Sequence, residues 1–357
     1  MLSYRVAVIQ WGEHDEISQG IVSELRKLGH QATPFMFDAK LPDNADLVFS
    51  FAPYNVLQHV FRQFAMTGPA HSRPFYLHWN TENIPDPRIP WPILRLVSVF
   101  RAWLDRLDDS KNPNARFWAG QFPFVQARRH LHRFRYVGDY FYAYQQGWLN
   151  LLIDSSELFA NWYKSHGLPA VFVPWGTLET YYADLHLPRN IDVLWFGQRR
   201  TRRRGQLVDY IQYQLESRGF KMYVADGVSH PFIYGETRTR LLNQAKITLN
   251  LLAAARHDNI FPYRFHVAAG NRCVVVTEPE LNHCSSYVAG THYIVATSQQ
   301  MVETIVYYLQ HEDERQQIAE NAYQLVTTKM TFGHSLRSIM QIVERARGDA
   351  DRLVGAG

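Results

Sequence analysis

Arginine is the side chain that stands out first, because five arginines fall within residues 196–204 (Phe-Gly-Gln-Arg-Arg-Thr-Arg-Arg-Arg). The cluster follows an apolar run and precedes a helical pattern. It is therefore expected at the carboxyl end of a strand, where open α/β sheets bind ligands. Guanidinium groups match phosphate oxygens in geometry. We predict that Arg203 and Arg204, which lie next to the helix, hold a phosphate group. The alternatives are a solvated basic turn and a nucleic-acid patch.

Residues 257–277 carry a second pattern that suits an anion. Pro262 fits the first turn of a short helix, where its missing N–H has no helical partner, and Gly270 fits the end of that helix. Residues 273–276 form an apolar run typical of a strand that is covered on both faces. Backbone N–H groups at the helix start favour an anion. A diphosphate is expected there, with Arg264 as a second ligand.

Two pairs of residues in the first half of the chain could act as a general base. Glu13 and His14 follow the first predicted strand, and His78 and Glu82 follow a later one. An imidazole or a carboxylate at such a place can take a proton from a hydroxyl group. An isolated run of polar residues is also a common turn, and the sequence does not choose between the two pairs.

Strand-like apolar runs alternate with helical periodicity along the chain, which predicts an α/β fold with parallel sheets. Strands are expected at 5–11, 31–37, 47–52, 75–79, 149–154, 171–173, 192–196, 221–225, 247–251, 273–276 and 293–296, with three helices within 299–346. Four prolines within 84–92 predict a rigid loop. Residues 93–148 have the least regular pattern. The two series of strands predict domains at 1–178, with an aromatic and basic insertion near 84–148, and at 179–357.

The segment that contains Arg264-Phe265-His266 and Ala269-Gly270 resembles the donor-site helix of GT-B glycosyltransferases. It is similar to the group-1-like bacterial branch that includes CgeB-type spore-coat proteins, many of which read Arg-x-Phe-Glu-x-x-Ala-x-Gly here. Many retaining relatives place two glutamates eight positions apart, where this chain has Asp258 and His266. The resemblance implies two Rossmann-like domains that face each other across a cleft, with C-terminal helices crossing back to the first domain.

The resemblance also implies a function, the transfer of a sugar from a nucleotide-diphosphate-sugar, most simply a UDP- or GDP-sugar, to an acceptor hydroxyl. The acceptor would be a glycan, a lipid-linked sugar or a small molecule bound by the first domain. The implied donor ligands are Gly197, Arg203, Arg204, Tyr234, Gly235, Asp258, Asn259, Tyr263, Arg264 and His266. Asp258 would accept hydrogen bonds from sugar hydroxyls or cap the helix. His266 would face the diphosphate or ribose, or be a satisfied semi-buried histidine.

Composition limits the other classes of function. The net charge of +4 is mild for a nucleic-acid-binding protein. Cys273 and Cys284 are the only cysteines, which favours a reducing, cytoplasmic location, and no His/Cys group has the spacing of a metal site. A diphosphate site made of arginines and a helix start needs no bound metal. Residues 116–135 combine five arginines with aromatic residues and no acid, which suits either an anionic membrane surface or a packed insertion.

Three other functions stay compatible with the sequence. A non-catalytic member of the fold would have lost its chemistry at 258 and 266. A nucleic-acid-binding protein would use the arginine loop and residues 116–135, with strongly salt-dependent binding. A sugar-nucleotide epimerase of the same architecture would act on the donor alone.

Overall fold

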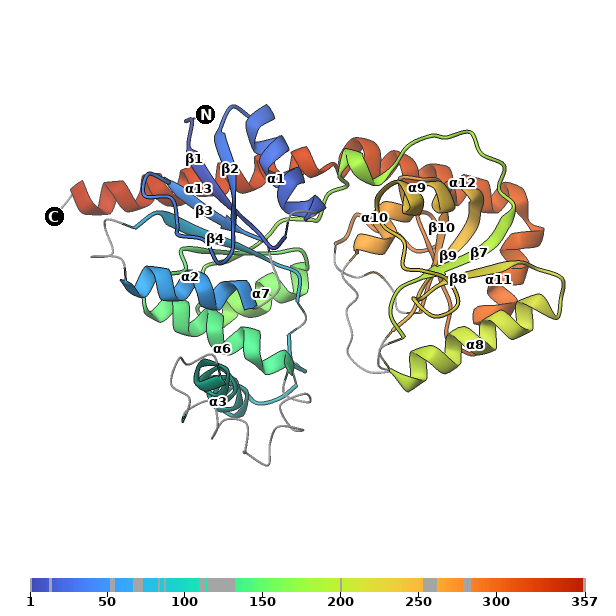
Figure 1. Ribbon diagram of the computed structural model, residues 1–357, viewed down its shortest axis with the longest axis horizontal. Coiled ribbons are helices and arrows are strands. Elements are labelled where there is room, and N and C mark those ends of the chain that lie inside the picture. Colours follow the sequence, from blue (N-terminus) through green and yellow to red (C-terminus); the bar gives the residue numbers. More distant parts are fainter. Residues whose placement is uncertain are drawn as a thin grey trace. The chain divides into compact units, whose positions relative to one another are not determined.

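The computed structural model divides the chain into two compact units. Unit 1 comprises Met1–Val173 and Leu336–Gly357, and unit 2 comprises Pro174–Ser335. The structure describes residues 2–12, 15–51, 55–66, 73–82, 84–86, 88–108, 114, 132–199, 201–252, 262–278, 281 and 284–355. Figure 1 shows a sheet with surrounding helices in each unit.

Unit 1 is built on six parallel strands in the order β2-β1-β3-β4-β5-β6. They are β1 (Arg5–Gln10), β2 (Gln31–Met36), β3 (Leu47–Ser50), β4 (Phe75–Asn80), β5 (Leu151–Asp154) and β6 (Ala170–Phe172). All residues of β3 and β5 are buried, as expected for parallel strands with both faces covered.

The helices of unit 1 include one that comes from the far end of the sequence. They are α1 (Glu16–Lys27), α2 (Asn55–Met66), α3 (Trp91–Asp108), α6 (His132–Gln145), α7 (Glu157–Ser165) and, from Leu336 onward, α13 (Phe332–Gly355). The N–H of Leu2 donates to Glu344 Oε1 at 2.9 Å, and the guanidinium of Arg347 lies 5.2 Å from the Tyr4 ring centroid. The chain therefore returns to unit 1, as the predicted fold requires.

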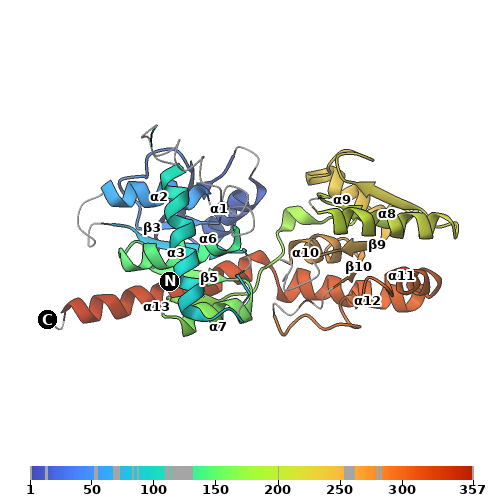
Figure 2. The same ribbon diagram turned by 90° about the horizontal axis from the view of Figure 1, so that it is seen from below.

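Helices α3 and α6 correct the expectation of an irregular segment at 93–148. They lie side by side (Figures 1 and 2), and a Cβ on Gly138 of α6 would be only 2.2 Å from the carbonyl oxygen of Ser98 in α3. The close approach depends on this glycine. Glycine and aromatic residues weaken a helical pattern, which explains why α6 is hard to predict from the sequence.

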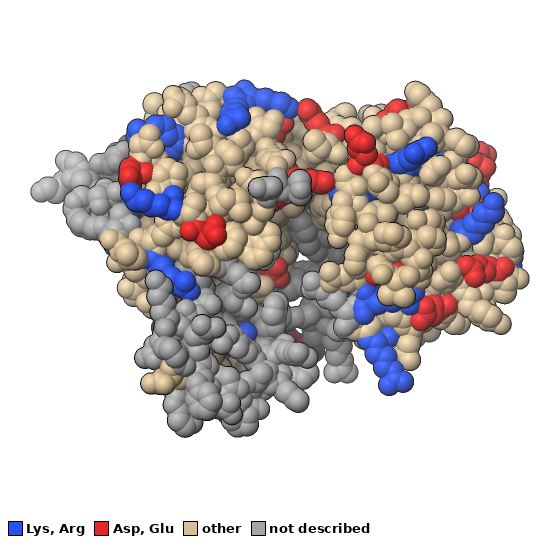
Figure 3. All heavy atoms as spheres, viewed as in Figure 1, with Lys and Arg blue, Asp and Glu red and all other residues tan. Residues whose placement is uncertain are grey.

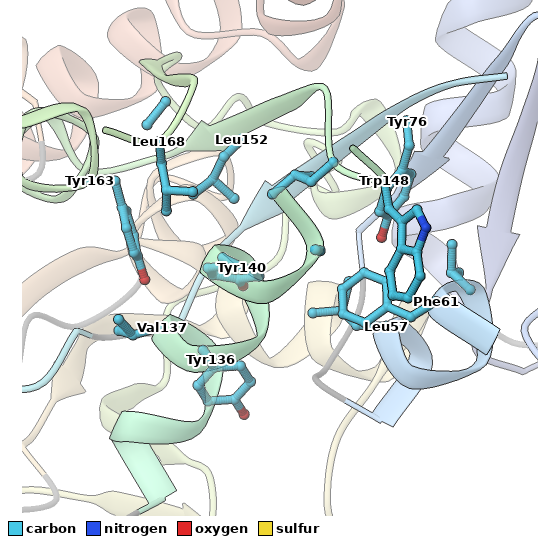
Figure 4. Packing of buried hydrophobic residues seen from close by; sticks show 14 of the residues in the cluster. Leu57, Phe61, Tyr76, Tyr136, Val137, Tyr140, Trp148, Leu152, Tyr163 and Leu168 are labelled. Carbon is cyan, nitrogen blue, oxygen red and sulfur yellow. The ribbon is translucent and has the colours of Figure 1, made fainter. Parts of the chain in front are cut away.

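Aromatic side chains fill much of the core of unit 1, where Figure 4 shows them between α2, α6 and the sheet. The ring centroids of Phe61 and Trp148 are 5.8 Å apart, and the ring centroids of Tyr140 and Tyr163 are 5.7 Å apart. Part of the heavy aromatic content of the chain thus serves packing.

Unit 2 has five parallel strands in the order β11-β10-β9-β7-β8. They are β7 (Ile191–Phe196), β8 (Met222–Ala225), β9 (Ala245–Asn250), β10 (Val274–Thr277) and β11 (Ile294–Val295). The chain passes from β7 to β8 on one side and then crosses to β9 on the other. The strand order therefore reverses between β7 and β9, which is where such sheets bind ligands, at the carboxyl ends of the strands.

The helices of unit 2 begin close to the predicted places. They are η2 (Glu179–Tyr181), α8 (Arg202–Glu216), α9 (Gly235–Gln244), α10 (Tyr263–Ala269), α11 (Met301–Gln310), α12 (Glu312–Gln324) and a π-helical turn (Leu325–Lys329). The sequence pattern predicts that the arginine cluster precedes this helix, but α8 starts within the cluster, at Arg202. Thr201 caps α8 by accepting a hydrogen bond from the N–H of Arg204 at 3.3 Å. The predicted α/β class with two Rossmann-like sheets is confirmed.

Candidate functional site

Arg264 lies at the place where the strand order of unit 2 reverses. Its Nη2 donates to the carbonyl oxygen of Phe196, the last residue of β7, at 2.8 Å. Its Nη1 donates to Oδ1 of Asn250, the last residue of β9, at 2.8 Å. One guanidinium therefore bridges the carboxyl ends of the two strands, and helix α10 supplies it from the first turn.

Gly197 makes room for this guanidinium. Its φ of +145° is unfavourable for other residues, and a Cβ at this position would lie 2.9 Å from Nη2 of Arg264. The predicted importance of Gly197 thus has a geometric basis, which is the close approach of Arg264 to the backbone after β7.

As far as the structure describes the chain, the charge of Arg264 is poorly compensated. Burial and, to a smaller extent, the positive charge of Arg204 together lower its pKa to about 10. Both hydrogen-bond acceptors of Arg264 are neutral oxygens, and within the described part of the chain its buried Nε has no partner. A half-buried cation that has no counter-ion among the described residues is costly, so the site favours a bound anion.

The start of α8 adds a second cation to this site. Arg204 is half-buried, its Nη1 donates to the carbonyl oxygen of Gln198 at 3.3 Å, and its charge acts on Arg264. The N-terminus of α8 and two guanidinium groups therefore face the same region, which is the arrangement that binds phosphate groups.

Two other arginines of the loop, Arg199 and Arg203, are held by carboxylates. Arg203 makes a two-pronged ion pair with Glu278, whose Oε2 also accepts the N–H of Leu252 at 3.0 Å. Arg199 pairs with Asp209 and Asp226. The structure therefore gives Arg203 a bracing contact in addition to its predicted place near Arg204. The sequence could not reveal these partners, because Glu278 lies 75 positions away from Arg203.

His266 is fully buried, and both of its ring nitrogens are hydrogen-bonded. Nδ1 lies 2.6 Å from Oγ1 of Thr177, and Nε2 lies 2.8 Å from Oη of Tyr287. Of the two roles expected for His266, this geometry favours the buried, satisfied histidine over a ligand contact.

Tyr263 contacts a residue that sequence reasoning missed. Its Oη accepts a hydrogen bond at 2.5 Å from Nη1 of Arg238, a buried arginine of α9 that also lies 5.2 Å from the ring centroid of Tyr181. Only a helical polar pattern surrounds Arg238 in the sequence, so no local signal marks it as buried. Tyr263 thus helps to fix α10 against α9.

Tyr234 and Gly235 lie at the start of α9, in the loop that follows the carboxyl end of β8. Tyr234 is 69% exposed, and Gly235 has a φ of +49°. Because β8 neighbours β7, both residues belong to the same edge of the sheet as Gly197. An exposed ring at this edge is available for stacking.

In unit 1, His78 belongs to a buried hydrogen-bonded chain at the carboxyl ends of β3, β4 and β5. Its Nδ1 lies 2.7 Å from Oγ of Ser50, and its Nε2 lies 3.0 Å from Oη of Tyr140. Burial lowers the pKa of His78 to about 3. Both ring nitrogens are therefore occupied, which favours a structural role over general-base catalysis. Glu82, the other candidate after β4, is half-buried.

Asp154, at the end of β5, was not predicted. Its Oδ2 accepts from Nδ2 of Asn80 at 2.6 Å, and its Oδ1 accepts from the N–H of Ser156 at 2.7 Å. Burial raises its pKa to about 8, although these hydrogen bonds lower it. The carboxyl after a buried strand was the available signal, and its burial was not visible in the sequence.

Several predicted residues lie outside the described part of the chain. They are Glu13, His14, Asp258 and Asn259, together with most of 116–135. Among the described residues, no group of histidine, cysteine and acidic side chains is placed to hold a metal ion. Nor does any helix in those residues have the length and apolar character needed to cross a membrane.

Comparisons with known proteins agree with this geometry. Residues 200–341 match the family described as Glycosyl transferase-like. No curated protein matches the chain by sequence.

Solved structures match nearly the whole chain. Sucrose-phosphate synthase from Thermosynechococcus elongatus is 9% identical, with a TM-score of 0.58 and coverage of 96% of this chain and 99% of that one. HepE from Anabaena, solved with UDP-glucose, is 11% identical, with a TM-score of 0.55 and coverage of 96% and 100%. WaaG, a glycosyltransferase of lipopolysaccharide biosynthesis, is 14% identical, with a TM-score of 0.55 and coverage of 94% and 99%.

The predicted resemblance to GT-B glycosyltransferases is confirmed by the match over 200–341 and by the similarity in fold, whereas the CgeB-type branch stays a prediction. The chain therefore has the fold of GT-B glycosyltransferases, and residues 200–341 are similar to a glycosyltransferase-like family.

Proposed function

We propose that the chain transfers a sugar from a nucleotide-diphosphate-sugar to an acceptor hydroxyl. The donor diphosphate binds to Arg264, Arg204 and the N-terminus of α8. The observation that carries this proposal is the guanidinium of Arg264 between the ends of β7 and β9, where its acceptors among the described residues are neutral oxygens. A diphosphate would supply the missing negative charge.

The same groups would assist the chemistry. The bond from the anomeric carbon to the β-phosphate oxygen breaks, the acceptor oxygen bonds to that carbon, and its proton leaves to a base. Negative charge grows on the leaving diphosphate, and fixed cations stabilise it there more than in the ground state. In this proposal Arg204 and Arg264 provide that charge, so the mechanism is independent of a metal ion.

The donor is proposed to be a UDP-sugar first and a GDP-sugar second. HepE, which shares the fold, was solved with UDP-glucose and with UDP. The exposed ring of Tyr234, after β8, is the proposed stacking surface for the base. Gly235 and Tyr263 complete this side of the proposed site, and Asp258 remains the proposed ligand of the sugar.

The acceptor is proposed to bind to unit 1, as a glycan, a lipid-linked sugar or a small molecule. Of the described base candidates we favour Glu82, because the ring of His78 is fully occupied by hydrogen bonds. Glu13 and His14 remain alternatives. Residues 116–135 are the proposed place of any peripheral membrane contact, and we propose a cytoplasmic location.

The test is calorimetric titration with UDP, GDP, ADP, CDP and dTDP, for the wild type and for Arg264→Met. We expect one nucleotide to bind best and Arg264→Met to weaken it at least tenfold, because a charged hydrogen bond is worth about 1.5–3 kcal/mol. Arg218→Met is the matched control, since Arg218 pairs with Glu303 on the surface of the same unit.

Removing a half-buried and poorly compensated charge should also leave the unfolding temperature of Arg264→Met at or above that of the wild type. Unchanged nucleotide affinity in Arg264→Met would refute the proposed diphosphate site. Equal weakening by Arg218→Met would point to nonspecific electrostatics.

A further inference from the structure

Unit 2 contains a basic pocket that the proposed donor site does not use. Its volume is about 270 Å³, and four cations line it: Arg189, Lys246, Arg272 and Arg315. The rest of the lining comes from residues 316, 319 and 320 of α12. This volume is slightly below the usual range for drug-sized ligands, so the pocket suits a small molecule.

The pocket lies at the edge of the sheet opposite to Arg264. Arg189 comes two residues before β7, Lys246 is the second residue of β9, and Arg272 comes two residues before β10. These are the amino ends of parallel strands, whereas Arg264 bridges the carboxyl ends of β7 and β9. With a rise of about 3.3 Å per residue, a six-residue strand separates the two places by roughly 20 Å.

The positively charged guanidinium of Arg189 donates its hydrogen bonds to neutral carbonyl oxygens. Its Nη1 donates to the carbonyl oxygens of Leu242 and Ala245, and its Nη2 donates to that of Asn271 at 2.8 Å. Burial lowers its pKa, and the charges of Arg315 and Arg272 lower it further. Arg315 and Arg272 are thus close enough to repel Arg189, although Asp184 partly offsets this, and an anion in the pocket would relieve the repulsion.

The other cations are held in position by contacts at their sides. Arg315 is 3% exposed and donates to the carbonyl oxygen of Tyr308 and to Oε1 of Glu312, both at 3.2 Å. Lys246 Nζ donates to Oδ1 of Asp192 at 2.6 Å. Such partners fix the direction of each side chain before a ligand arrives.

Arg272 neutralises the one acid of the lining. Its Nε donates to Oε2 of Glu320 at 2.8 Å, and its guanidinium carbon lies 3.6 Å from the ring centroid of Tyr323. The Nη1 of Arg272 also reaches Oδ2 of Asp184 at 3.2 Å. Glu320 is therefore part of the frame that orients Arg272.

We propose that this pocket is a second anion site that binds the phosphate group of a small molecule. Three guanidinium groups and one ammonium group line the pocket, and such groups match the several oxygens of phosphate. A carboxylate ligand has fewer oxygens than phosphate to accept hydrogen bonds from these four cations. The site is separate from the donor site and stands whether or not the chain binds a nucleotide.

The experiment is calorimetric titration of the full chain with inorganic phosphate, at constant ionic strength set with chloride. Every variant is made in the Arg264→Met background, so that phosphate binding at the donor site does not contribute. The pocket variant is Lys246→Gln, because the side chain of Lys246 is 28% exposed and its change leaves the three arginines in place. The control is Arg218→Gln, which removes an equal charge from the same unit.

We expect saturable phosphate binding in the Arg264→Met protein, at least tenfold weaker binding after Lys246→Gln, and no change after Arg218→Gln. A second pocket variant, Arg315→Lys, keeps the charge but loses the fork and should weaken binding severalfold. Unfolding curves without phosphate establish that each variant is folded. Titrations with glycerol 3-phosphate and with phosphatidate vesicles then separate a free phosphate ester from a lipid headgroup.

Absence of saturable binding at millimolar phosphate would overturn the proposal. So would phosphate binding that Lys246→Gln leaves unchanged, because the anion would then lie elsewhere. Equal competition by chloride would also overturn it, since the pocket would not recognise a phosphate group.

Discussion

At the scale of single residues, the buried chain in unit 1 has one direction of hydrogen bonding. Tyr140 Oη donates to Oδ1 of Asn80 at 2.7 Å, so its oxygen must accept from Nε2–H of His78. His78 Nδ1 then accepts from Ser50, and Ser50 accepts from Tyr76. The hydroxyls of Ser50 and Tyr140 each donate one hydrogen bond and accept one, which fixes the neutral Nε2–H tautomer of His78.

Asp154 should make the stability of unit 1 depend on pH. Its pKa is raised to about 8 in the folded state, whereas an unfolded aspartate titrates near 4. Between these values the folded state holds a proton that the unfolded state lacks, so stability falls as pH rises. Asp154 contributes a slope of up to about 1.4 kcal/mol per pH unit below pH 8. The histidine at position 78 still holds part of a proton in the unfolded state at pH 6.5, which partly offsets this slope until about pH 7.5, above which it is neutral in both states.

Thermal unfolding at pH 6.5, 7.5 and 8.5 checks this prediction. The Asp154→Asn side chain cannot ionise, so the fall in stability with rising pH that Asp154 causes should disappear. The new amide group would face the Nδ2 of Asn80, which should lower the stability at every pH. Asp46→Asn is the control, because Asp46 is paired with Arg5 and has a lowered pKa, so the slope should remain. An equal slope in Asp154→Asn and the wild type would contradict the assignment.

Gly197→Ala should weaken nucleotide binding through Arg264. The new Cβ would lie 2.9 Å from Nη2 of Arg264, so that side chain must shift. We expect at least a tenfold loss of affinity in the titration. Gly219→Ala is a matched control, since Gly219 also has a positive φ, +85°, and no atom within 4 Å of its would-be Cβ. Equal losses of affinity in both variants would attribute the effect to backbone strain alone.

At the scale of elements, the packing of α3 on α6 depends on Gly138. A Cβ there would lie 2.2 Å from a backbone oxygen of α3, which has no rotamer to change. Gly138→Ala should therefore separate the helices and cost about 1–3 kcal/mol of unfolding free energy, or more. Gly348→Ala in α13 meets nothing within 4 Å and should be neutral or stabilise by up to about 1 kcal/mol. Denaturant unfolding measures both, and equal effects would contradict the packing argument.

The elements of the chain show what sequence can predict. Apolar runs located every described strand to within a few residues, because parallel strands are buried on both faces. Helices α3 and α6 escaped prediction, because aromatic residues, arginines and Gly138 blur the helical period. Helix α2 was also not predicted from the sequence.

The site shows a similar division. Position at a strand end singled out Gly197, Arg204 and Arg264 as candidates, since topology brings such ends together. The bracing of Arg203 by Glu278 and the burial of Arg238 depend on contacts between residues distant in the sequence. Local pattern carries no information about such contacts.

At the scale of the whole molecule, α13 makes the end of the chain a part of unit 1. Leu336, Ile339, Met340 and Val343 follow a helical period and are completely buried. Their burial on unit 1 means that its stability depends on residues that follow unit 2 in the sequence. The two units should therefore respond separately to changes in α13 and to nucleotide.

Met340→Ala should destabilise unit 1 by about 2–5 kcal/mol, because a buried side chain leaves a cavity when it is shortened. Unit 2 keeps its own core, so the affinity for nucleotide should stay within about twofold of the wild type. A tenfold change would correspond to about 1.4 kcal/mol of binding free energy. Calorimetric unfolding with and without nucleotide measures both effects. Nucleotide should raise the transition of unit 2 in both proteins, while the substitution lowers that of unit 1. If Met340→Ala instead weakened nucleotide binding tenfold, the donor site would depend on unit 1, and its assignment to the edge of the unit 2 sheet would be incomplete.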